Sequence, residues 1–438
     1  MKLTWKGAVV VAAVAGLLTG CSNPGAPAES TGEVTWPAQS TKLDGTTLTV
    51  WAAASSTKTA DSVIAGFEKA TGAKVNVVTI PDPYEQGVQT KVATGDKPDL
   101  AFWQPTSSQL TALNAAQNLQ PLTNAPWLSN YKDNLADITG QVNGTRYAAL
   151  FSAPAVQGVY YNKDVFAKAG ITKTPKNWEE FIAAARQIKD KGTTPFFDFA
   201  GGGSSWATQW WVQVQLADAA KAGLWDRVNT GKEKFTDSTI QTAVNNYNNL
   251  IKDGLFNSNI KTATFEDQGK ALLAGDAAMV VQINGFAEQL QQRADTATLN
   301  KKIGFFPISP TGNVATVIPD QGNALVAFKT GDSNREAAAR QFLAYWLGDG
   351  YSGFVKAQGA VSIEKGVDTP SSVPDALTAA VAAVPTAVGS MQASAIANPD
   401  LYINLGDMIQ GTKTPQQVTE ATQQQFAGLA KAQGAAGF

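Results

Sequence analysis

The stretch "LDGTTLTVWAAASSTKTADSVIAGFEKATGAKVNVVTI", residues 43–80, predicts a strand, a helix and a second strand in that order. In its middle, apolar side chains recur at the spacing of one helix face, at Ala60, Val63, Ile64 and Phe67. Gly72 is expected to end this helix as its C-terminal cap. A strand, a helix and a strand in succession are typical of a parallel sheet with helices on its faces. The stretch therefore predicts an α/β fold.

The same alternation continues along the chain. A helix within residues 84–94 leads to the strand "PDLAF" (98–102), and a second α/β run begins near Tyr147 with extended chain over 147–162. Further elements are expected as a helix capped by Asn177 (177–192), strands at 277–283, 302–309 and 323–328, a helix at 334–348, and a mostly helical C-terminal hundred residues. The chain has 438 residues, more than one core usually holds, which favours two domains.

The composition excludes several classes of function. Charged residues are only 16% of the chain, and 34 basic residues nearly balance 36 acidic ones, so neither nucleic acid nor a membrane surface is an expected partner of the folded body. The chain has no histidine, which excludes Ser-His-Asp and Cys-His nucleophile systems and histidine-bound zinc. Cys21 is the only cysteine, so a disulfide or a thiolate metal site within the chain is excluded too. We expect no metal and no cofactor.

The N-terminus has the pattern of an export signal. Lys2 and Lys6 precede an apolar run over residues 7–18, and "LTGC" (18–21) follows at once. This pattern resembles the bacterial lipoprotein signal, which is cut before a cysteine that then carries lipid. A transmembrane anchor is the alternative, but the apolar run is too short to span a bilayer.

The expected processing sets the location of the protein. Residues 1–20 are expected to be the lipoprotein signal peptide, and Cys21 is expected to be lipidated. Residues 21–41 are rich in Pro, Gly, Ser and Thr and predict a flexible tether. We therefore expect an extracytoplasmic protein that is anchored to the cell membrane through its N-terminal lipid only.

Several segments together resemble the family 1 extracellular solute-binding proteins, which are the sugar-binding receptors of ABC importers. The most specific are "VYYNKDVFAKAGI" (159–171) and "TPKNWEEFIAAARQIKDKG" (174–192). The other matching segments are "FEKATGAKVNVV" (67–78), "VATGDKPDLAFW" (92–103), "NLQPLT" (118–123), "VNGTRYAA" (142–149), "FEDQGKALLAGDAAMVVQINGF" (265–286), "KIGFFPIS" (302–309) and "NREAAARQFLAYWL" (334–347).

The resemblance implies a two-lobed periplasmic-binding-protein-like fold of type II, with two α/β lobes joined by hinge strands. Lobe 1 would take residues 42–152 and 308–355, and lobe 2 would take 153–307 and 356–438. It also implies a receptor, not an enzyme, which clasps a sugar or oligosaccharide between its lobes. Its further partners would be the membrane permease subunits and their ATPase, and we expect a monomer.

Candidate ligand contacts in lobe 1 follow from the chemistry of sugars, which offer hydroxyl groups and flat C–H patches to polar and aromatic side chains. Trp103 is the first candidate, because it ends a strand and matches a sugar-contacting Trp of the family; a core position is its alternative. Ser55 and Ser56 follow the first strand, where capping of the next helix is the alternative. Tyr84 and Glu85 match a polar contact loop, although Glu85 could equally be a solvated helix start.

The other candidates come from four segments, of which 319–323 falls within the bounds of lobe 1 and the other three fall within those of lobe 2. Within residues 201–211, Trp206 and Trp210 have the spacing of one helix face and are the candidates for the cleft, while the adjacent Trp211 would point elsewhere. Relatives usually carry Trp where this chain has Phe286. The remaining candidates are Asn284, Gly285 and Phe286 in "QINGF" (282–286), Asp320 and Gln321 in "PDQGN" (319–323), and Tyr402 in "NPDLYINLGD" (398–407).

The resemblance has limits at other positions. Ala155, Thr106 and Ser107 replace charged contacts that the family's maltose binder uses. The identity of the sugar is therefore not transferred with the fold, and a binding protein for a non-sugar solute stays open.

Two enzymatic readings are alternatives. "SSTK" (55–58), "YYN" (160–162) and "KTG" (329–331) occur in the order typical of serine acylases of the penicillin-binding type, with Ser55 and Lys58 as the reactive pair. A glycosidase would need two carboxylates in an aromatic cleft, and no pair stands out in the sequence. Both alternatives are weaker than the receptor.

Overall fold

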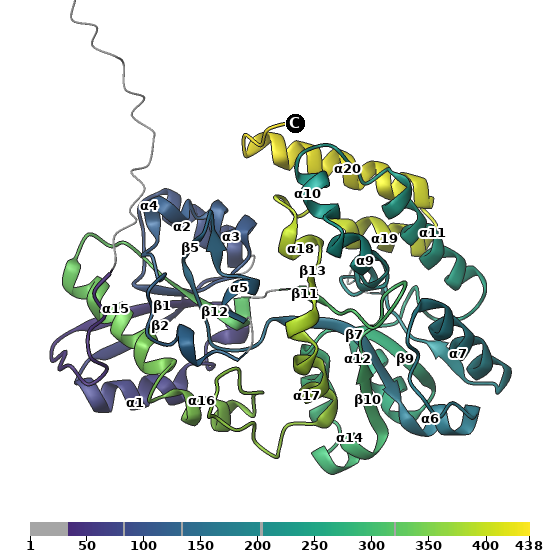
Figure 1. Ribbon diagram of the computed structural model, residues 1–438, viewed down its shortest axis with the longest axis horizontal. Helices are drawn as coiled ribbons and strands as arrows, with labels where there is room; N and C mark the ends of the chain where they lie inside the picture. Colours follow the sequence, from purple (N-terminus) through teal and green to yellow (C-terminus); the bar gives the residue numbers. More distant parts are fainter. Residues whose placement is uncertain (1–33, 82–83, 133–134, 202–204, 319–320) are drawn as a thin grey trace, which may run out of the picture. The chain divides into compact units, whose positions relative to one another are not determined.

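The computed structural model describes residues 34–81, 84–132, 135–201, 205–318 and 321–438. It contains a five-stranded and a six-stranded sheet, each with its own packed helices and its own hydrophobic core (Figure 1). We call the body around the five-stranded sheet lobe 1 and the body around the six-stranded sheet lobe 2. The expected α/β class with two lobes is therefore confirmed.

Lobe 1 is built on the strand order β2-β1-β3-β12-β6. Its strands are β1 (Thr47–Ala52), β2 (Lys74–Thr79), β3 (Leu100–Phe102), β6 (Ala148–Leu150) and β12 (Ala324–Ala327), with a separate hairpin of β4 (Gln141–Val142) and β5 (Thr145–Arg146). Its helices are η1 (Ala54–Ser56), α1 (Asp61–Thr71), α2 (Tyr84–Ala93), α3 (Ser107–Ala112), α4 (Ala115–Asn118), η2 (Leu128–Asn130), α5 (Leu135–Ile138), η4 (Gln321–Asn323), α15 (Ser333–Trp346) and α16 (Tyr351–Gln358).

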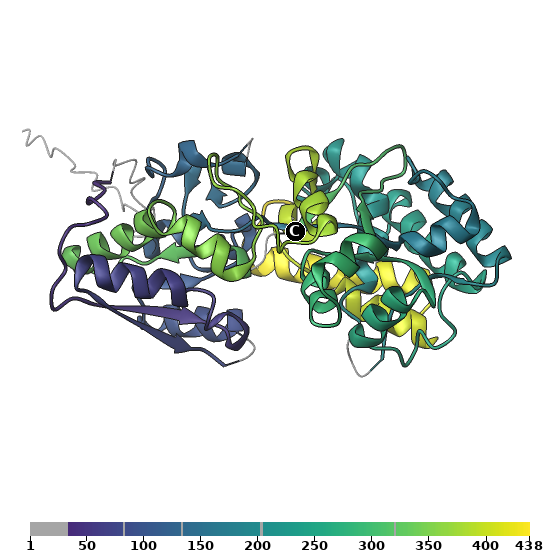
Figure 2. The ribbon, with the colours of Figure 1, turned by 90° about the horizontal axis from the view of Figure 1, so that it is seen from below.

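The sheet of lobe 1 is parallel only in part. β1 pairs in parallel with β2 and β3, as the opening stretch of the sequence predicts. β12 runs antiparallel to both β3 and β6, between which it lies. The parallel pairing expected from the sequence therefore holds for β1, β2 and β3, whereas β12 comes from a distant part of the chain and needs no βαβ crossover to enter the sheet. In Figures 1 and 2, α1 and α15 lie side by side on this sheet.

Lobe 2 has the strand order β13-β11-β7-β9-β8, with β10 also paired to β7. Its strands are β7 (Ala155–Asn162), β8 (Thr194–Phe196), β9 (Ala277–Gln282), β10 (Ile303–Phe306), β11 (Thr316–Ile318) and β13 (Val388–Gly389). Its helices are α6 (Lys163–Ala169), α7 (Trp178–Asp190), α8 (Thr208–Gln213), η3 (Val214–Leu216), α9 (Ala217–Lys221), α10 (Leu224–Asn229), α11 (Ser238–Lys252), α12 (Phe265–Ala274), α13 (Gly285–Gln291), α14 (Thr296–Lys302), α17 (Asp375–Ala382), η5 (Val384–Thr386), α18 (Met391–Ser394), α19 (Leu401–Gln410) and α20 (Pro415–Ala432).

Local sequence signals set several helix ends as expected. Gly72 ends α1 with a φ of 82°, in the left-handed region that glycine adopts without a steric penalty. The side chain of Asn177 accepts a hydrogen bond from the backbone N–H of Glu180 and so caps α7. The C-terminal helix α19 packs on α8, and α20 packs on α11. Figure 1 shows α20 in yellow beside the teal α11.

The chain passes between the two sheets in three segments. The first joins β6 to β7, and the second joins β11 to β12. The third lies between α16, which packs on α1, and α17, which packs on β7 and β10. The residue bounds given above for the two lobes stay a proposal about how the chain divides.

The N-terminal segment is held against lobe 1 from the first described residues onward. Trp36 packs edge-on against Trp127 with 4.9 Å between ring centroids, and its indole N–H donates to Asn124 Oδ1. The amide of Gln341 donates to the carbonyl of Thr41 at 2.8 Å. The flexible tether expected over 21–41 therefore does not extend to residues 34–41, because an aromatic contact of the half-buried Trp36 and hydrogen bonds attach them to lobe 1. Residues 1–33, with the expected signal peptide and Cys21, lie outside the described residues.

Candidate functional site

A cavity of about 600 Å³ lies where the connecting segments meet elements of both lobes. Its polar lining residues are Ser56, Thr59, Ser152, Asn284, Glu288, Gln291, Asn323 and Gln358. Its other lining residues are Phe151, Ala153, Ala155, Ile283, Gly285, Gly322, Phe354, Gly359, Ala360, Val361, Leu377 and Val381. A concave site with a few polar groups over an apolar floor is the usual form of a small-molecule site.

Two asparagine side chains fix the first connecting segment along one side of the cavity. The amide of Asn323, just before β12, donates to Ser152 Oγ at 2.9 Å and to the carbonyl of Ala153 at 2.8 Å. The Oδ1 of Asn284, just after β9, accepts from the backbone N–H of Val156 at 3.0 Å. Asn284 also donates to the carbonyl of Pro154 at 3.3 Å. Each lobe thus contributes one amide that holds residues 152–156 beside the cavity.

Aromatic rings form part of the cavity floor. Phe151 stacks on Trp346 with 4.7 Å between ring centroids, and Phe354 meets Phe151 edge-on at 5.6 Å. Phe151 and Phe354 are each 2% exposed, so their faces are largely covered by lobe 1. The rings give the cavity a rigid apolar base.

Trp103 and Tyr84 lie in the core of lobe 1. Trp103 is completely buried, and its indole N–H donates to the carbonyl of Gln109 at 3.0 Å. Tyr84 packs beside it and donates its hydroxyl to the carbonyl of Phe102 at 2.7 Å, and burial raises the pKa of Tyr84 well above its usual value. Neither ring has an accessible face in this structure. A ligand contact for either residue stays a prediction.

The polar candidates of lobe 1 lie at different places in the structure. Ser56 lines the cavity, and its hydroxyl donates to the carbonyl of Ala53 at 3.3 Å. No side chain caps α1, so capping is not what places Ser56 there. Glu85 is half-buried and accepts a hydrogen bond from the amide of Gln104 at 3.0 Å. The side chain of Ser55 lies outside the described residues.

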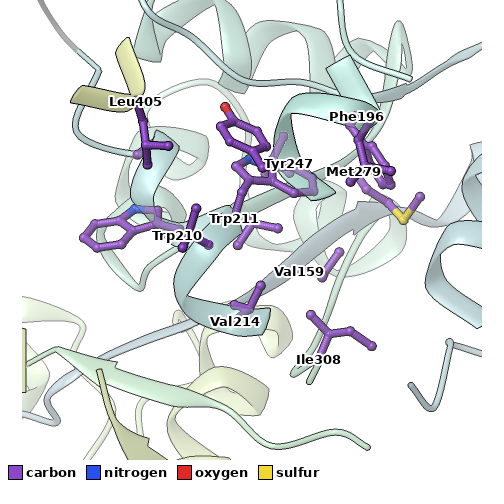
Figure 3. Close-up of a cluster of buried hydrophobic side chains, with 14 of the residues drawn as sticks. Val159, Phe196, Trp210, Trp211, Val214, Tyr247, Met279, Ile308 and Leu405 are labelled. Carbon is purple, nitrogen blue, oxygen red and sulfur yellow. The ribbon is translucent and has the colours of Figure 1, made fainter. Parts of the chain in front are cut away.

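The tryptophans near residue 206 belong to the core of lobe 2. Figure 3 shows Trp210 and Trp211 inside that core, where Trp211 stacks on Tyr247 at 6.1 Å and is completely buried. Trp210 is 4% exposed, and its ring lies 6.2 Å from that of Trp206. Trp206 is half-buried and meets Phe265 edge-on at 5.1 Å. Cleft-facing roles for Trp206 and Trp210 stay predictions.

The "QINGF" segment reaches the cavity through its polar residues. Asn284 and Gly285 line the cavity, whereas Phe286 is completely buried against Tyr160 at 5.3 Å. A Cβ added at Gly285 would meet no atom within 4 Å, so there is open space next to its backbone. The predicted stacking face of Phe286 is turned into the core, because the ring lies on the opposite side of α13 from the cavity.

The last candidates are only partly described. Asp320 and the side chain of Gln321 lie outside the described residues, although the backbone of Gln321 begins η4. Tyr402 is half-buried at the start of α19, where desolvation and the neighbouring Asp400 raise its pKa. Its carbonyl accepts from Ser205 Oγ at 3.0 Å, and ligand contact by its ring stays a prediction.

Of the sequence candidates, the structure brings together Ser56, Asn284 and Gly285 at the cavity. The sequence interpretation missed Glu288 and Gln291, which lie on the same helix face as Asn284. Their spacing of four and three residues is the signal that could have found them. It also missed Asn323 and Gln358, which no local pattern marks.

Three residues of the alternative enzymatic motifs have structural positions. The side chain of Asn162 accepts from two backbone N–H groups at the start of α6, and Tyr160 is completely buried. Lys329 donates to the carbonyl of Ala116 at 2.8 Å. Within the described ranges, no group of three or more His, Cys, Asp or Glu residues could hold a metal ion. In the same ranges, none of the helices combines the length and the apolar character that crossing a membrane requires.

Comparisons with known proteins point to one family. A family model described as bacterial extracellular solute-binding protein matches residues 53–352. The multiple sugar-binding protein of Streptococcus mutans is 28% identical over 250 residues, 56% of this chain and 57% of that protein. An sn-glycerol-3-phosphate-binding periplasmic protein of Brucella abortus is 29% identical over 140 residues, 29% of each chain. The chain thus spans about half the length, or less, of the curated relatives it matches.

Solved structures agree over almost the whole chain. The apo form of RafE from Streptococcus pneumoniae has a TM-score of 0.73 and 22% identity, and covers 91% of this chain and 100% of its own. A chitin oligosaccharide binding protein has a TM-score of 0.71 and 21% identity, and covers 89% of this chain and 100% of its own. These similarities confirm the two-lobed fold.

Proposed function

The chain belongs to the family of bacterial extracellular solute-binding proteins, and we propose that it is the sugar-binding receptor of an ABC importer. The cavity at the connecting segments carries this proposal. Its volume of about 600 Å³ lies within the roughly 300–1,000 Å³ of small-molecule sites. The family supports a receptor over the acylase and glycosidase alternatives.

The lining of the cavity suits a sugar. Amide and hydroxyl groups both donate and accept hydrogen bonds, which matches the hydroxyl groups around a sugar ring. Gln291 and Asn284 come from lobe 2, and Gln358, Thr59 and Ser56 come from lobe 1. A sugar that bonds to both groups would hold the two lobes together, and this differential affinity would favour a closed form.

The wider biology follows from the same proposal. Several relatives and neighbours are named for sugars, among them a RafE complex with raffinose and a transporter protein in complex with stachyose. We propose that permease subunits recognise the closed form and that their ATPase drives uptake. We further propose that the protein is a monomer, held at the cell membrane by lipid on Cys21. The proposal includes ligand contacts at Trp103, Ser55, Tyr84, Glu85, Trp206, Trp210, Phe286, Asp320, Gln321 and Tyr402.

Blocking the cavity tests the function. Gly285→Trp would add an indole at the cavity lining, on a Cβ that meets no atom within 4 Å. We expect it to abolish binding of the sugars that wild-type protein selects from a carbohydrate library, measured by thermal shift and then by calorimetry.

Gly428→Trp is the matched control, because Gly428 is also exposed, also has no atom within 4 Å of an added Cβ, and lies in α20 away from the cavity lining. It should bind as wild type does. Equal sugar binding by both variants would contradict the cavity as the site. Selection of a non-sugar solute, such as sn-glycerol 3-phosphate, would contradict the ligand class.

A further inference from the structure

A second, smaller cavity adjoins the first one at the connecting segments, and we call it the apolar pocket. It lies between α5 of lobe 1, the third connecting segment, and α17 with η5 of lobe 2. Its volume is about 320 Å³, at the lower end of the roughly 300–1,000 Å³ of small-molecule sites. Ala153, Val361 and Val381 line both the apolar pocket and the larger cavity, so the two lie side by side.

Aliphatic side chains form much of the wall of the apolar pocket. They include Leu135, Val361, Ile363, Val381 and Val384. Leu135, Ile363 and Val384 are themselves buried, so packing against their neighbours holds this part of the wall in place. Such a wall offers dispersion contacts to a bound group and removes apolar surface from water.

The polar side chains of the apolar pocket are bonded within the protein. The ammonium group of Lys132 donates to the carbonyl of Ser362 at 3.0 Å. The hydroxyl of Ser362 donates to the backbone carbonyl two residues further on at 3.1 Å, and Thr369 Oγ1 accepts from the backbone N–H of Ser362 at 3.1 Å. The hydroxyl of Thr378 donates to the backbone carbonyl four residues before it at 3.4 Å. These polar groups therefore serve the backbone, and a solute gains mainly from the apolar surface.

A polar cavity and an apolar pocket with shared walls fit a ligand that has one polar and one apolar part. We propose that the apolar pocket receives an alkyl or aryl group attached to the sugar, so that the receptor prefers glycosides with an apolar substituent. The sugar occupies the larger cavity and the substituent occupies the pocket. The pocket has about twice the volume of a cavity of about 150 Å³ that holds benzene, so a six-carbon chain or ring fits. This inference rests on the proposed function and adds the class of the group that the sugar carries.

Two substitutions at Ala382 test the inference. Ala382 is exposed at the end of α17 and lines the apolar pocket but not the larger cavity. Ala382→Trp adds an indole at the pocket lining, and Ala382→Asp adds a carboxylate, which opposes burial of an apolar chain. Ala379→Trp and Ala379→Asp are the matched controls, because Ala379 is also exposed on α17 and lines neither site. The probes are the methyl and hexyl β-glycosides of glucose, galactose, N-acetylglucosamine, maltose and lactose.

The measured quantity is the ratio of the two affinities within each pair of glycosides. In calorimetry, wild-type protein should bind the hexyl glycoside of at least one sugar about sixtyfold more tightly than the methyl glycoside. Burial of one methylene is worth about fourfold in affinity, and this ratio corresponds to about three buried methylenes. Each Ala382 variant should lower the ratio at least about fivefold, whereas the Ala379 variants should keep it.

Failure of the proposed function and failure of this inference give different results. If every glycoside and the wider carbohydrate library fail to bind wild-type protein, the proposed function is overturned, and this inference with it. If wild-type protein binds sugars but no hexyl glycoside binds more than about tenfold tighter than its methyl partner, this inference alone is overturned. An undiminished ratio in both Ala382 variants would also overturn it alone, because the chain would then bind elsewhere.

Discussion

Trp103 lies at the end of β3, where the chain leaves the sheet. A large aromatic side chain at this position can contact a ligand or pack in the core. In the sequence, a large aromatic residue directly after a buried strand predicts a ring that a ligand covers. In the structure, α3 covers the ring instead, through Gln109, whose carbonyl accepts the indole proton at 3.0 Å. Only the packing of α3 on the ring distinguishes core packing from ligand contact, because the residues around Trp103 in the sequence do not indicate which segment will cover it.

Replacing Trp103 separates stability from binding. Trp103→Leu removes much of a fully buried ring and the indole hydrogen bond, so we expect the free energy of unfolding to fall by about 2–4 kcal/mol. Urea denaturation measures this fall. Calorimetry on the folded variant decides between the two explanations, because an unchanged sugar affinity would mean that the ring serves the core alone. A large loss of affinity would instead support the ligand contact that the sequence predicts.

Glu364 is a buried carboxyl group in the third connecting segment. It is 3% exposed, one of its oxygens has no hydrogen-bond partner among the described residues, and burial raises its pKa from 4.5 to about 8. The unfolded chain releases the proton above about pH 4.5, whereas the folded chain keeps it up to about pH 8. This group therefore makes the folded state lose stability as the pH rises between these two values.

Glu364→Gln should remove this dependence. We expect the variant to gain roughly 4 kcal/mol relative to wild type when the pH rises from about 5 to about 9, because each pH unit between the two pKa values is worth about 1.4 kcal/mol. Urea denaturation at both pH values measures the difference, and the exposed Glu266→Gln variant serves as the control. An equal difference between Glu364→Gln and wild type at both pH values would show that the native carboxyl titrates in its usual range.

The connecting segments are the elements that place the cavity. Asn323 and Asn284 hold residues 152–156 from opposite lobes, and both side chains also line the cavity. These amides hold residues 152–154, which belong to no strand, and add to the pairing of Ala155 and Val156 with β11. The sequence predicts the helices and strands of this region. It does not predict the hydrogen bonds of these two amides, because each joins residues more than 120 positions apart.

A double-mutant cycle measures one of these bonds. Asn323→Ala and Ser152→Ala each remove one partner of the Nδ2–Oγ hydrogen bond of 2.9 Å. We expect a coupling free energy of about 0.5–1.5 kcal/mol in urea denaturation. The Ala153 carbonyl bond of Asn323 persists in the Ser152→Ala variant, so additive single effects would mean that the Ser152 bond contributes nothing to stability.

At the scale of the whole molecule, local signals predict the elements better than their arrangement. Gly72 and Asn177 end and begin their helices as expected, because caps depend on a few adjacent residues. The two-lobed class also follows from the sequence. The antiparallel β12 and the inward face of Phe286 do not, because each depends on packing against distant chain.

The site was predictable only in part for the same reason. Ser56, Asn284 and Gly285 reach the cavity because they follow strand ends, which is a local property. Glu288 and Gln358 reach it through the faces of helices whose orientation the cores of the lobes decide. Aromatic content was a poor guide, since Trp103, Trp210 and Phe286 serve the cores.

The place of β12 in lobe 1 also sets an order for folding during synthesis. β12 lies between β3 and β6, and the amide of Gln120 donates to the carbonyl of Phe328, 208 residues further along the chain. The ribosome makes the first strands of the lobe 1 sheet early, but this sheet lacks its inner strand β12 until residue 327 has emerged. All of β7 to β11 is made in the meantime. Domains fold as units as the chain appears, so the lobe that begins first is completed late, and its early strands wait with open edges.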